Sequence, residues 1–229
     1  MAADVLAIAA QGAHALPVVT ALTVQDHNQV HEVVPVDAAL LLRQGRALIA
    51  ACTIGAVKIG IPGNRANADA IAQMVAALRA QNPDLPVVLD PVLASGHGDV
   101  LGAGNALDAL APLLLLATLV LPNLAEAAAL AGRMTGDVLV TGGHGEGADI
   151  VNRWRGAQGQ ERSWRWPRLA GEFHGSGCTL AAAVAARLAL GDTMPDALGR
   201  AQAYTHQALA RSFALGAGQR IPQRCINLS

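Results

Sequence analysis

The sequence is poor in aromatic side chains and in charge. Only 3% of its 229 residues are aromatic and 14% are charged, and the formal net charge is -1. Nucleic-acid surfaces need a basic excess, and base-stacking sites need aromatic rings. We therefore expect neither a nucleic acid nor a membrane surface as a partner, and interpret the arginines of residues 153–168 as a solvated strand surface.

Cysteine pairs and long apolar runs are lacking as well. Cys52, Cys178 and Cys225 are widely spaced and form no C-x-x-C pair. This pattern predicts neither a disulfide framework nor a zinc site, and the seven histidines show no metal spacing either. It favours a reducing, cytoplasmic location, as does the absence of a basic signal segment in residues 1–4. No apolar run is long enough to span a bilayer.

Short apolar segments alternate with amphipathic or alanine-rich ones along the chain. Strands are expected over residues 5–9, 18–24, 56–60, 86–90, 118–121 and 138–141, and a hairpin over 150–155 and 161–166. Helices are expected over residues 37–51, 66–81, 107–116, 123–131, 178–190 and 196–215. This order predicts one α/β domain over residues 1–229, in which helices cover both faces of a mostly parallel sheet. Ligands of such sheets bind beyond the carboxyl ends of the strands.

The glycine-rich segment 171–180 is the most informative part of the sequence. Gly175 and Gly177 bracket Ser176, and Cys178 follows at the start of a small-residue helix. A glycine turn that opens a helix directs free N–H groups at one place, where the helix dipole favours an anion. A thiolate is stabilised in the same turn, so the segment predicts a phosphate site beside a titratable group. The alternative is an ordinary helix start with a small buried cysteine.

Several further motifs follow strands in a fixed order. They are Asp90-Pro-Val with Ala-Ser-Gly-His-Gly-Asp at 94–99, Pro122-Asn-Leu-Ala-Glu126, Thr141-Gly-Gly143 and His174-Gly-Ser-Gly-Cys-Thr179. Together they resemble the hydroxymethylpyrimidine/phosphomethylpyrimidine kinases of thiamine biosynthesis, which have a ribokinase-like fold. The resemblance covers nearly the whole chain, including Thr20–Gln25, Lys58–Gly60 and residues 203–219.

The resemblance implies ATP-dependent phosphoryl transfer, with Mg²⁺, to the hydroxymethyl group of 4-amino-5-hydroxymethyl-2-methylpyrimidine and to its monophosphate. The implied anion hole is Gly175, Ser176, Gly177 and Cys178, with the Cys178 thiolate as base and His174 as a residue that orients it. The implied nucleotide-binding residues are Asn123, Thr141, Gly142 and Gly143, and the implied metal-binding residues are Glu126 and Asp90. The implied pyrimidine-binding residues are Gln25, Lys58 and Gly60.

Each side chain among these also has a structural alternative. Gln25 has the alternative of a turn residue before Asp26, and Lys58 could equally be a structural ion-pair partner. Glu126 has the alternative of an exposed helix carboxylate, and Asp90 that of a strand-end residue that caps the backbone.

The sequence departs from the resembled family at three places. A glycine-rich segment is missing after the expected strand 5–9, which leaves a closed site difficult to build. A crossover helix is missing between residues 131 and 138, and Thr141 replaces a lysine, so another cation would have to screen phosphate charge there.

Two other functions compete with the pyrimidine kinase. One is a catalytically impaired relative that binds a pyrimidine or a nucleotide, and the other is a kinase of pyridoxal or hydroxyethylthiazole. Gln25 and Cys178 favour the pyrimidine. A homodimer is expected, through the apolar run 18–24 or the tryptophan-containing hairpin.

Overall fold

The computed structural model describes residues 1–93, 106–143 and 145–225. The helices are α1 (Ala2–Ala10), α2 (Ala38–Ala51), α3 (Arg65–Gln81), α4 (Ala106–Leu114), α5 (Leu124–Ala129), α6 (Ser176–Ala189) and α7 (Met194–Ala210). The strands are β1 (Ala21–Gln25), β2 (Val30–Pro35), β3 (Val57–Ile59), β4 (Val87–Leu89), β5 (Leu119–Val120), β6 (Asp137–Val140), β7 (Asp149–Arg155) and β8 (Glu161–Pro167). None of the helices in these described segments is both long and apolar enough to cross a membrane.

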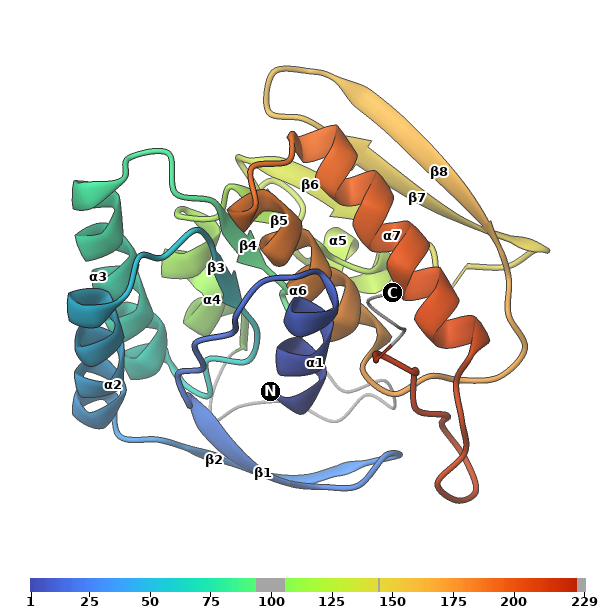
Figure 1. The fold of residues 1–229 in the computed structure, drawn as a ribbon, viewed down its shortest axis with the longest axis horizontal. Coiled ribbons are helices and arrows are strands. Elements are labelled where there is room, and N and C mark those ends of the chain that lie inside the picture. The colour runs from blue at the N-terminus through green and yellow to red at the C-terminus, as the bar shows by residue number, and fades with distance from the viewer. Residues whose placement is uncertain (94–105, 144, 226–229) are drawn as a thin grey trace.

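The central sheet follows chain order from β3 to β8 (Figure 1). Strands β3, β4, β5 and β6 are parallel, whereas β7 and β8 form an antiparallel hairpin at one edge. The predicted, mostly parallel sheet and its hairpin are therefore confirmed. The carboxyl ends of four neighbouring strands meet along one edge, as a ligand site of this fold class requires.

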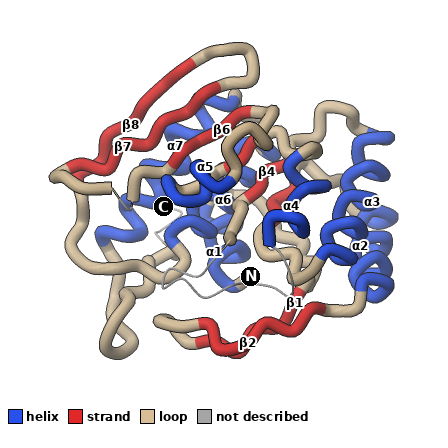
Figure 2. Tube along the Cα trace, turned by 180° about the vertical axis from the view of Figure 1, so that it is seen from behind, coloured by secondary structure: helices blue, strands red, loops and turns tan. Residues whose placement is uncertain are grey.

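Two apolar layers sandwich the sheet. Val87 and Leu89 of β4 pack in a cluster with α3 and α4, whereas Val88 packs on the opposite face with α6 and α7. This alternation follows from the period of two in a strand. Helices α1, α6 and α7 lie in front of the sheet in Figure 1, and α4 and α5 lie on the side seen in Figure 2. The predicted three-layer arrangement is confirmed.

Most boundaries agree with the sequence within a few residues, but the amino-terminal prediction is wrong. Residues 5–9 belong to helix α1 rather than to a buried strand. A short apolar run does not distinguish a buried strand from a helix, and here only Ala7 of α1 is fully buried. Residues 5–9 therefore do not form the strand that, in the resembled family, comes directly before the glycine-rich segment.

Four further points separate the sequence-based expectations from the structure or confirm them. Strand β2 was not predicted, and α7 ends at Ala210 rather than at residue 215. The short helix α5 alone connects the parallel strands β5 and β6, so the crossover forms without the second helix that is missing between residues 131 and 138. Asp37 caps α2 as predicted, since its carboxylate accepts a hydrogen bond from Leu40 N at 2.9 Å.

Strands β1 and β2 form a separate two-stranded ribbon below α1 in Figure 1. The base of the ribbon is fixed near the end of β3, where Thr20 Oγ1 donates to Ile61 O at 2.7 Å. Its tip is fixed to the segment that follows α7: Asn28 Nδ2 donates to Ala217 O at 3.0 Å, and Gln219 N donates to Asn28 Oδ1 at 2.8 Å. The ribbon thus spans from the carboxyl edge of the sheet to the carboxyl-terminal segment of the chain.

Candidate active site

Helix α6 begins at a glycine turn, as the sequence predicts. Gly175 is the N-cap and has a left-handed backbone with φ of 71°. The first backbone hydrogen bond of the helix runs from Thr179 N to Gly175 O at 3.0 Å. The N–H groups of Ser176, Gly177 and Cys178 come before that bond, so helix geometry leaves them without an acceptor inside the helix. They provide an anion-binding position at the helix start.

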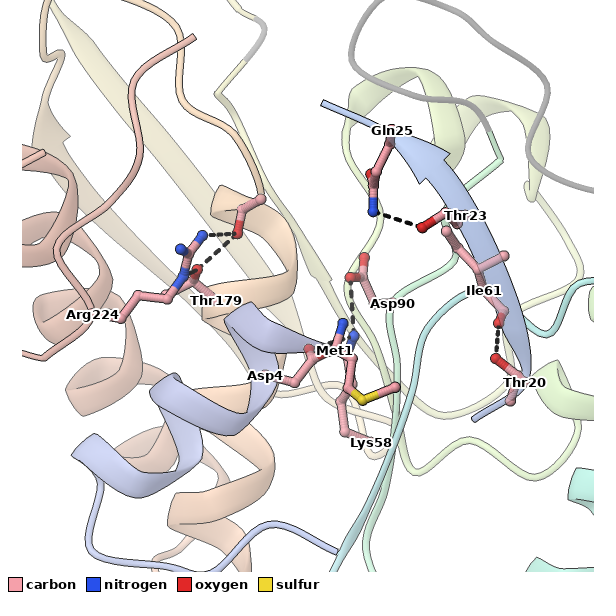
Figure 3. A network of polar contacts seen from close by, with 11 residues as sticks. Met1, Asp4, Thr20, Thr23, Gln25, Lys58, Ile61, Asp90, Thr179 and Arg224 are labelled. Carbon is pink, nitrogen blue, oxygen red and sulfur yellow. Dashed lines mark hydrogen bonds and ion pairs between the residues drawn. The ribbon is translucent and has the colours of Figure 1, made fainter. Parts of the chain in front are cut away.

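A buried ionic group lies beside this helix start. Lys58 Nζ, from β3, is 2.9 Å from Asp4 Oδ1 of α1 and 3.6 Å from Asp90 Oδ2, directly after β4 (Figure 3). The Lys58 and Asp90 side chains are each 9% exposed. The ion-pair alternative for Lys58 is therefore confirmed, and Asp4 is a partner that the sequence analysis did not identify.

The ionisation of this group is set by mutual charge as well as by burial. Burial opposes the charged form of Lys58, but Cys178, Asp90 and Asp4 outweigh it and raise the lysine pKa. Burial likewise opposes ionisation of Asp4, but Lys58 and the Met1 amino group lower the pKa of that carboxyl. Lys58 and Asp4 therefore form a charged pair at neutral pH.

Cys178 lies at the predicted position, but its pKa moves in the unexpected direction. Burial, together with the charges of Asp90 and Asp4, raises the pKa of the thiol to about 12, although Lys58 acts to lower it. The helix start does not overcome the loss of solvent around the sulfur. In this state of the protein Cys178 is a thiol rather than a thiolate.

Asn123 and Glu126 form a capping box at the start of α5. Glu126 N donates to Asn123 Oδ1 and Asn123 N donates to Glu126 Oε2, both at 2.9 Å. Leu93 N donates to Glu126 Oε1 at 3.4 Å. Glu126 is therefore a structural residue of the helix start and not simply an exposed helix carboxylate, and the sequence analysis missed this role.

The charge of Glu126 is linked to that of Asp90. Burial raises the pKa of Glu126, and the Asp90 carboxylate raises it further. Within the described parts of the chain, no set of three or more histidine, cysteine, aspartate or glutamate side chains is arranged to hold a metal ion. Asp90 and Glu126 would therefore hold a cation only with ligands from water or from a bound substrate.

The Thr141–Gly143 turn lies next to the start of α5. Thr141 N donates to Pro122 O at 2.9 Å, and Thr141 bridges to Asn123 in parallel register. A Cβ atom on Gly142 would lie only 2.4 Å from Val151 O, so this position requires glycine. Gly142 N also donates to the buried Asn152 Oδ1 at 2.9 Å. The Thr141–Gly143 turn and the cap of α5, which the resemblance implies for nucleotide binding, thus lie side by side.

Gln25 lies apart from these residues, at the end of β1. Its side chain is exposed and donates to Thr23 Oγ1 at 2.9 Å. Gly60 follows β3, where a Cβ atom would lie 3.0 Å from Lys58 Nζ. The ribbon therefore carries Gln25 between its anchored base and its anchored tip, and Gly60 lies against the buried ionic group.

Two arginines near the site were not predicted as site residues, and Arg168, grouped in the sequence with the solvated strand arginines, follows β8 and contacts a loop instead. Arg168 donates to the carbonyl oxygens of Gly143, Gly145 and Gly147 at 2.7–2.8 Å. Arg224 is buried against the α6 start. Asp4, Arg168 and Arg224 have no motif around them in the sequence; only their contacts identify them. Residues 94–99 and His144, singled out in the sequence, lie outside the described residues.

Comparison with known proteins agrees with this arrangement. A family model described as phosphomethylpyrimidine kinase matches residues 1–137 and 133–223. The hydroxymethylpyrimidine/phosphomethylpyrimidine kinase of Streptomyces coelicolor is 34% identical over 239 residues, which cover 94% of this chain and 85% of that protein. The kinase of the same name from Rhizobium meliloti is 34% identical over 237 residues, with 95% and 87% covered.

Solved structures give the same result. Phosphomethylpyrimidine kinase from Clostridium difficile 630 superimposes with a TM-score of 0.73 at 26% identity, covering 90% of this chain and 91% of that one. An ADP complex of Bacillus subtilis pyridoxal kinase gives a TM-score of 0.83 at 23% identity, with 97% and 90% covered, and shows the shared fold. With a family model that matches most of its length and relatives at 34% identity, the chain belongs to the phosphomethylpyrimidine kinase family.

Proposed function

We propose that this protein transfers the γ-phosphoryl group of ATP to the hydroxymethyl oxygen of 4-amino-5-hydroxymethyl-2-methylpyrimidine, and then phosphorylates the monophosphate. The observation that carries the proposal is the glycine start of α6, with its free N–H groups, beside Cys178, Lys58 and Asp90 at the carboxyl edge of the parallel sheet. The curated relatives at 34% identity carry the name of this kinase.

The N–H groups at the α6 start would stabilise the charge on the transferred phosphoryl group. Fixed donors of this kind are a large part of catalysis when charge develops at a known place. ATP supplies the phosphoryl group. The Gly142–Gly143 turn and Asn123 fit its other phosphates, because the turn has no side chains to obstruct them and lies beside the α5 cap.

Cys178 would accept the hydroxyl proton of the substrate as a thiolate. Its thiol is protonated in the free protein, with Asp90 among the charges that raise its pKa, so it must first lose that proton to solvent. Neutralisation of Asp90 by a bound cation would therefore lower the pKa of Cys178 while Lys58 continues to favour the thiolate. Phosphoryl transfer through a loose transition state depends mainly on positioning and electrostatics, so proton acceptance by Cys178 can come late.

Mg²⁺ would be held at Asp90 and Glu126, in part through water. Asp90 Oδ2 is buried and has no hydrogen-bond partner among the described residues, with Lys58 Nζ 3.6 Å away. Glu126 has a raised pKa that the Asp90 charge helps to cause, so a cation between the two carboxylates would relieve their repulsion. The chemistry of this donor set fits a hard cation.

Gln25 would bind the aminopyrimidine through its amide, which offers a donor and an acceptor together. The ribbon that carries Gln25 is anchored at its base and at its tip, and it would supply cover in place of the missing glycine-rich segment. Pyridoxal remains the alternative acceptor, because solved pyridoxal kinases share the fold at low identity.

We propose a cytoplasmic homodimer that buries the ribbon. Leu22 and Val34 face each other across β1 and β2, and with Val24 they are 63%, 45% and 53% exposed. An isolated two-stranded ribbon is marginally stable, and a second subunit would cover this apolar face. Light scattering of the purified protein checks the dimer, and a monomer would contradict it.

A substrate panel tests the proposed function. The rate of ATP consumption should be highest with the hydroxymethylpyrimidine and lower with pyridoxal and hydroxyethylthiazole, and it should require Mg²⁺. Gln25→Ala should raise KM for the pyrimidine and leave KM for ATP unchanged. Binding of nucleotide without turnover of any acceptor would favour a catalytically impaired relative instead.

A further inference from the structure

Arg224 is a buried cation that the proposed mechanism does not yet use. Its side chain belongs to a residue that is only 6% exposed. The guanidinium donates to Thr179 Oγ1 at 2.8 Å (Figure 3). It also donates to His174 O at 2.9 Å and, at the longer distance of 3.5 Å, to Gly175 O. All three acceptors belong to the turn and first residues of α6.

These contacts fix the direction of two peptide planes. The described chain has no cis peptide bonds, and in a trans peptide the C=O and N–H groups point in opposite directions. His174 O points at Arg224, so the N–H of Gly175 points away from it. Gly175 O accepts from Thr179 N at 3.0 Å and Thr179 Oγ1 at 2.7 Å as well as from Arg224, so the N–H of Ser176 also points away.

The charge of Arg224 has no directly paired carboxylate. Across the described residues, no aspartate or glutamate lies within ion-pair distance of its guanidinium. The charge of Asp4 acts to raise the pKa of Arg224, but the Asp4 carboxylate pairs with Lys58, with Oδ1 2.9 Å from Nζ. A buried charge that contacts only neutral groups is costly unless an anion compensates it. Burial accordingly lowers the pKa of Arg224.

The backbone holds Arg224 in this place independently of its side chain. Tyr204 OH donates to Arg224 O at 2.9 Å, and Gln223 N donates to Ala208 O at 2.9 Å, so α7 fixes the segment. A bridge between Phe173 and Arg220 ties the same segment to the residues that lead into the glycine turn. The guanidinium is therefore a fixed part of the helix start.

We propose that Arg224 is a positioning residue of the anion site, which aims the N–H groups of the Gly175 turn at the phosphoryl group and adds a fixed positive charge behind them. The proposal rests on the proposed function.

Binding of inorganic pyrophosphate tests this role without any turnover. Titration calorimetry would compare the wild type with Arg224→Gln, which removes the charge, and Arg224→Lys, which keeps it. Loss of the fixed charge and its hydrogen bonds in Arg224→Gln should raise the dissociation constant of pyrophosphate by about tenfold. Arg224→Lys should bind more tightly than Arg224→Gln. Arg220→Gln is the matched control, because Arg220 lies in the same segment but donates to Ser212, and it should bind as the wild type does.

The outcomes separate this inference from the proposed function. Equal pyrophosphate affinity in the wild type and Arg224→Gln would overturn it, and so would a wild type that shows no measurable binding. It would also be overturned if Arg224→Gln and Arg224→Lys lost affinity and melting temperature to the same extent, because the loss would then reflect stability alone. Wild-type turnover of the pyrimidine, measured in parallel, would leave the proposed function standing in each case. Arg224-dependent binding without turnover would support the anion site and contradict the kinase.

Discussion

Replacement of Lys58 by methionine should destabilise the protein strongly. The change leaves the partly buried Asp4 and the buried Asp90 without their shared cation, which lies 2.9 and 3.6 Å from their oxygens. At an effective dielectric constant of about 20, each ion pair at this range is worth roughly 5 kcal/mol before the desolvation of lysine is subtracted. Removal of one partner from a buried pair typically costs about 3–5 kcal/mol, and we expect a loss of that size.

Urea denaturation followed by tryptophan fluorescence measures this loss. Arg65→Met is the matched control, because Arg65 and Asp69 form an ion pair of the same 2.9 Å length with side chains that are 57% and 47% exposed. Such an exposed pair is worth at most about 1 kcal/mol. The double variant Lys58→Met/Asp4→Asn should regain part of the stability, because it removes one of the two carboxylates that lose Lys58 as a partner.

The pH dependence has a defined sign. In the wild type the lowered pKa of Asp4 gives stability that is present above its ordinary value of 3.8 and is lost as the pH falls through the lowered value. In Lys58→Met the largest influence that lowers the pKa of Asp4 is gone, while burial still raises that pKa and the Met1 amino group still lowers it. The deficit relative to wild type should therefore shrink as the pH falls toward 3.8. A deficit no larger than that of Arg65→Met, or one that grows on acidification, would refute the reasoning.

Three further predictions concern the glycine turn, the thiol and the capping box. Gly142→Ala should cost about 1–3 kcal/mol of unfolding free energy, because its Cβ would lie 2.4 Å from Val151 O. Gly143→Ala should cost less, because a Cβ there meets open space, and equal melting temperatures of the two variants would contradict this. Cys178 should react with iodoacetamide more slowly than the exposed Cys52 and Cys225 at pH 8, because burial raises its pKa to about 12. Peptide mass spectrometry measures the order of labelling, and preferential labelling of Cys178 would show that it is a thiolate. Glu126→Gln should keep the stability of α5, since glutamine also completes a capping box, but it should weaken the response of activity to Mg²⁺. Glu126→Ala should weaken that response and also cost about 1 kcal/mol of stability. An unchanged Mg²⁺ response in both variants would place the metal elsewhere.

The sequence predicts the central sheet because its strands are buried on both faces. Val87-Val-Leu89 is continuously apolar and bounded by proline and aspartate, and it appears as β4. It does not predict α1, because an alanine-rich apolar run fits either a helix or a strand until its neighbours are known. It also misses β2, whose exposed and partly buried residues show no clean alternation.

The candidate site divides in the same way. Gly175–Cys178, Asn123 with Glu126, and Thr141–Gly143 are contiguous motifs, and the structure places each at a strand end or helix start. Asp4 and Arg224 come from opposite ends of the chain and contact the site only through tertiary packing. The direction of the Cys178 pKa depends on burial and on three surrounding charges, none of which a local motif contains.

The most direct test is the mass of the product formed from ATP and 4-amino-5-hydroxymethyl-2-methylpyrimidine, with protein whose intact mass agrees with 23.4 kDa. A pyrimidine kinase of the proposed kind should add one phosphoryl group and then a second to the same molecule, and Cys178→Ala should slow both steps far more than it weakens ATP binding. A pyrimidine that stays unmodified while the protein binds the nucleotide would contradict the proposed reaction.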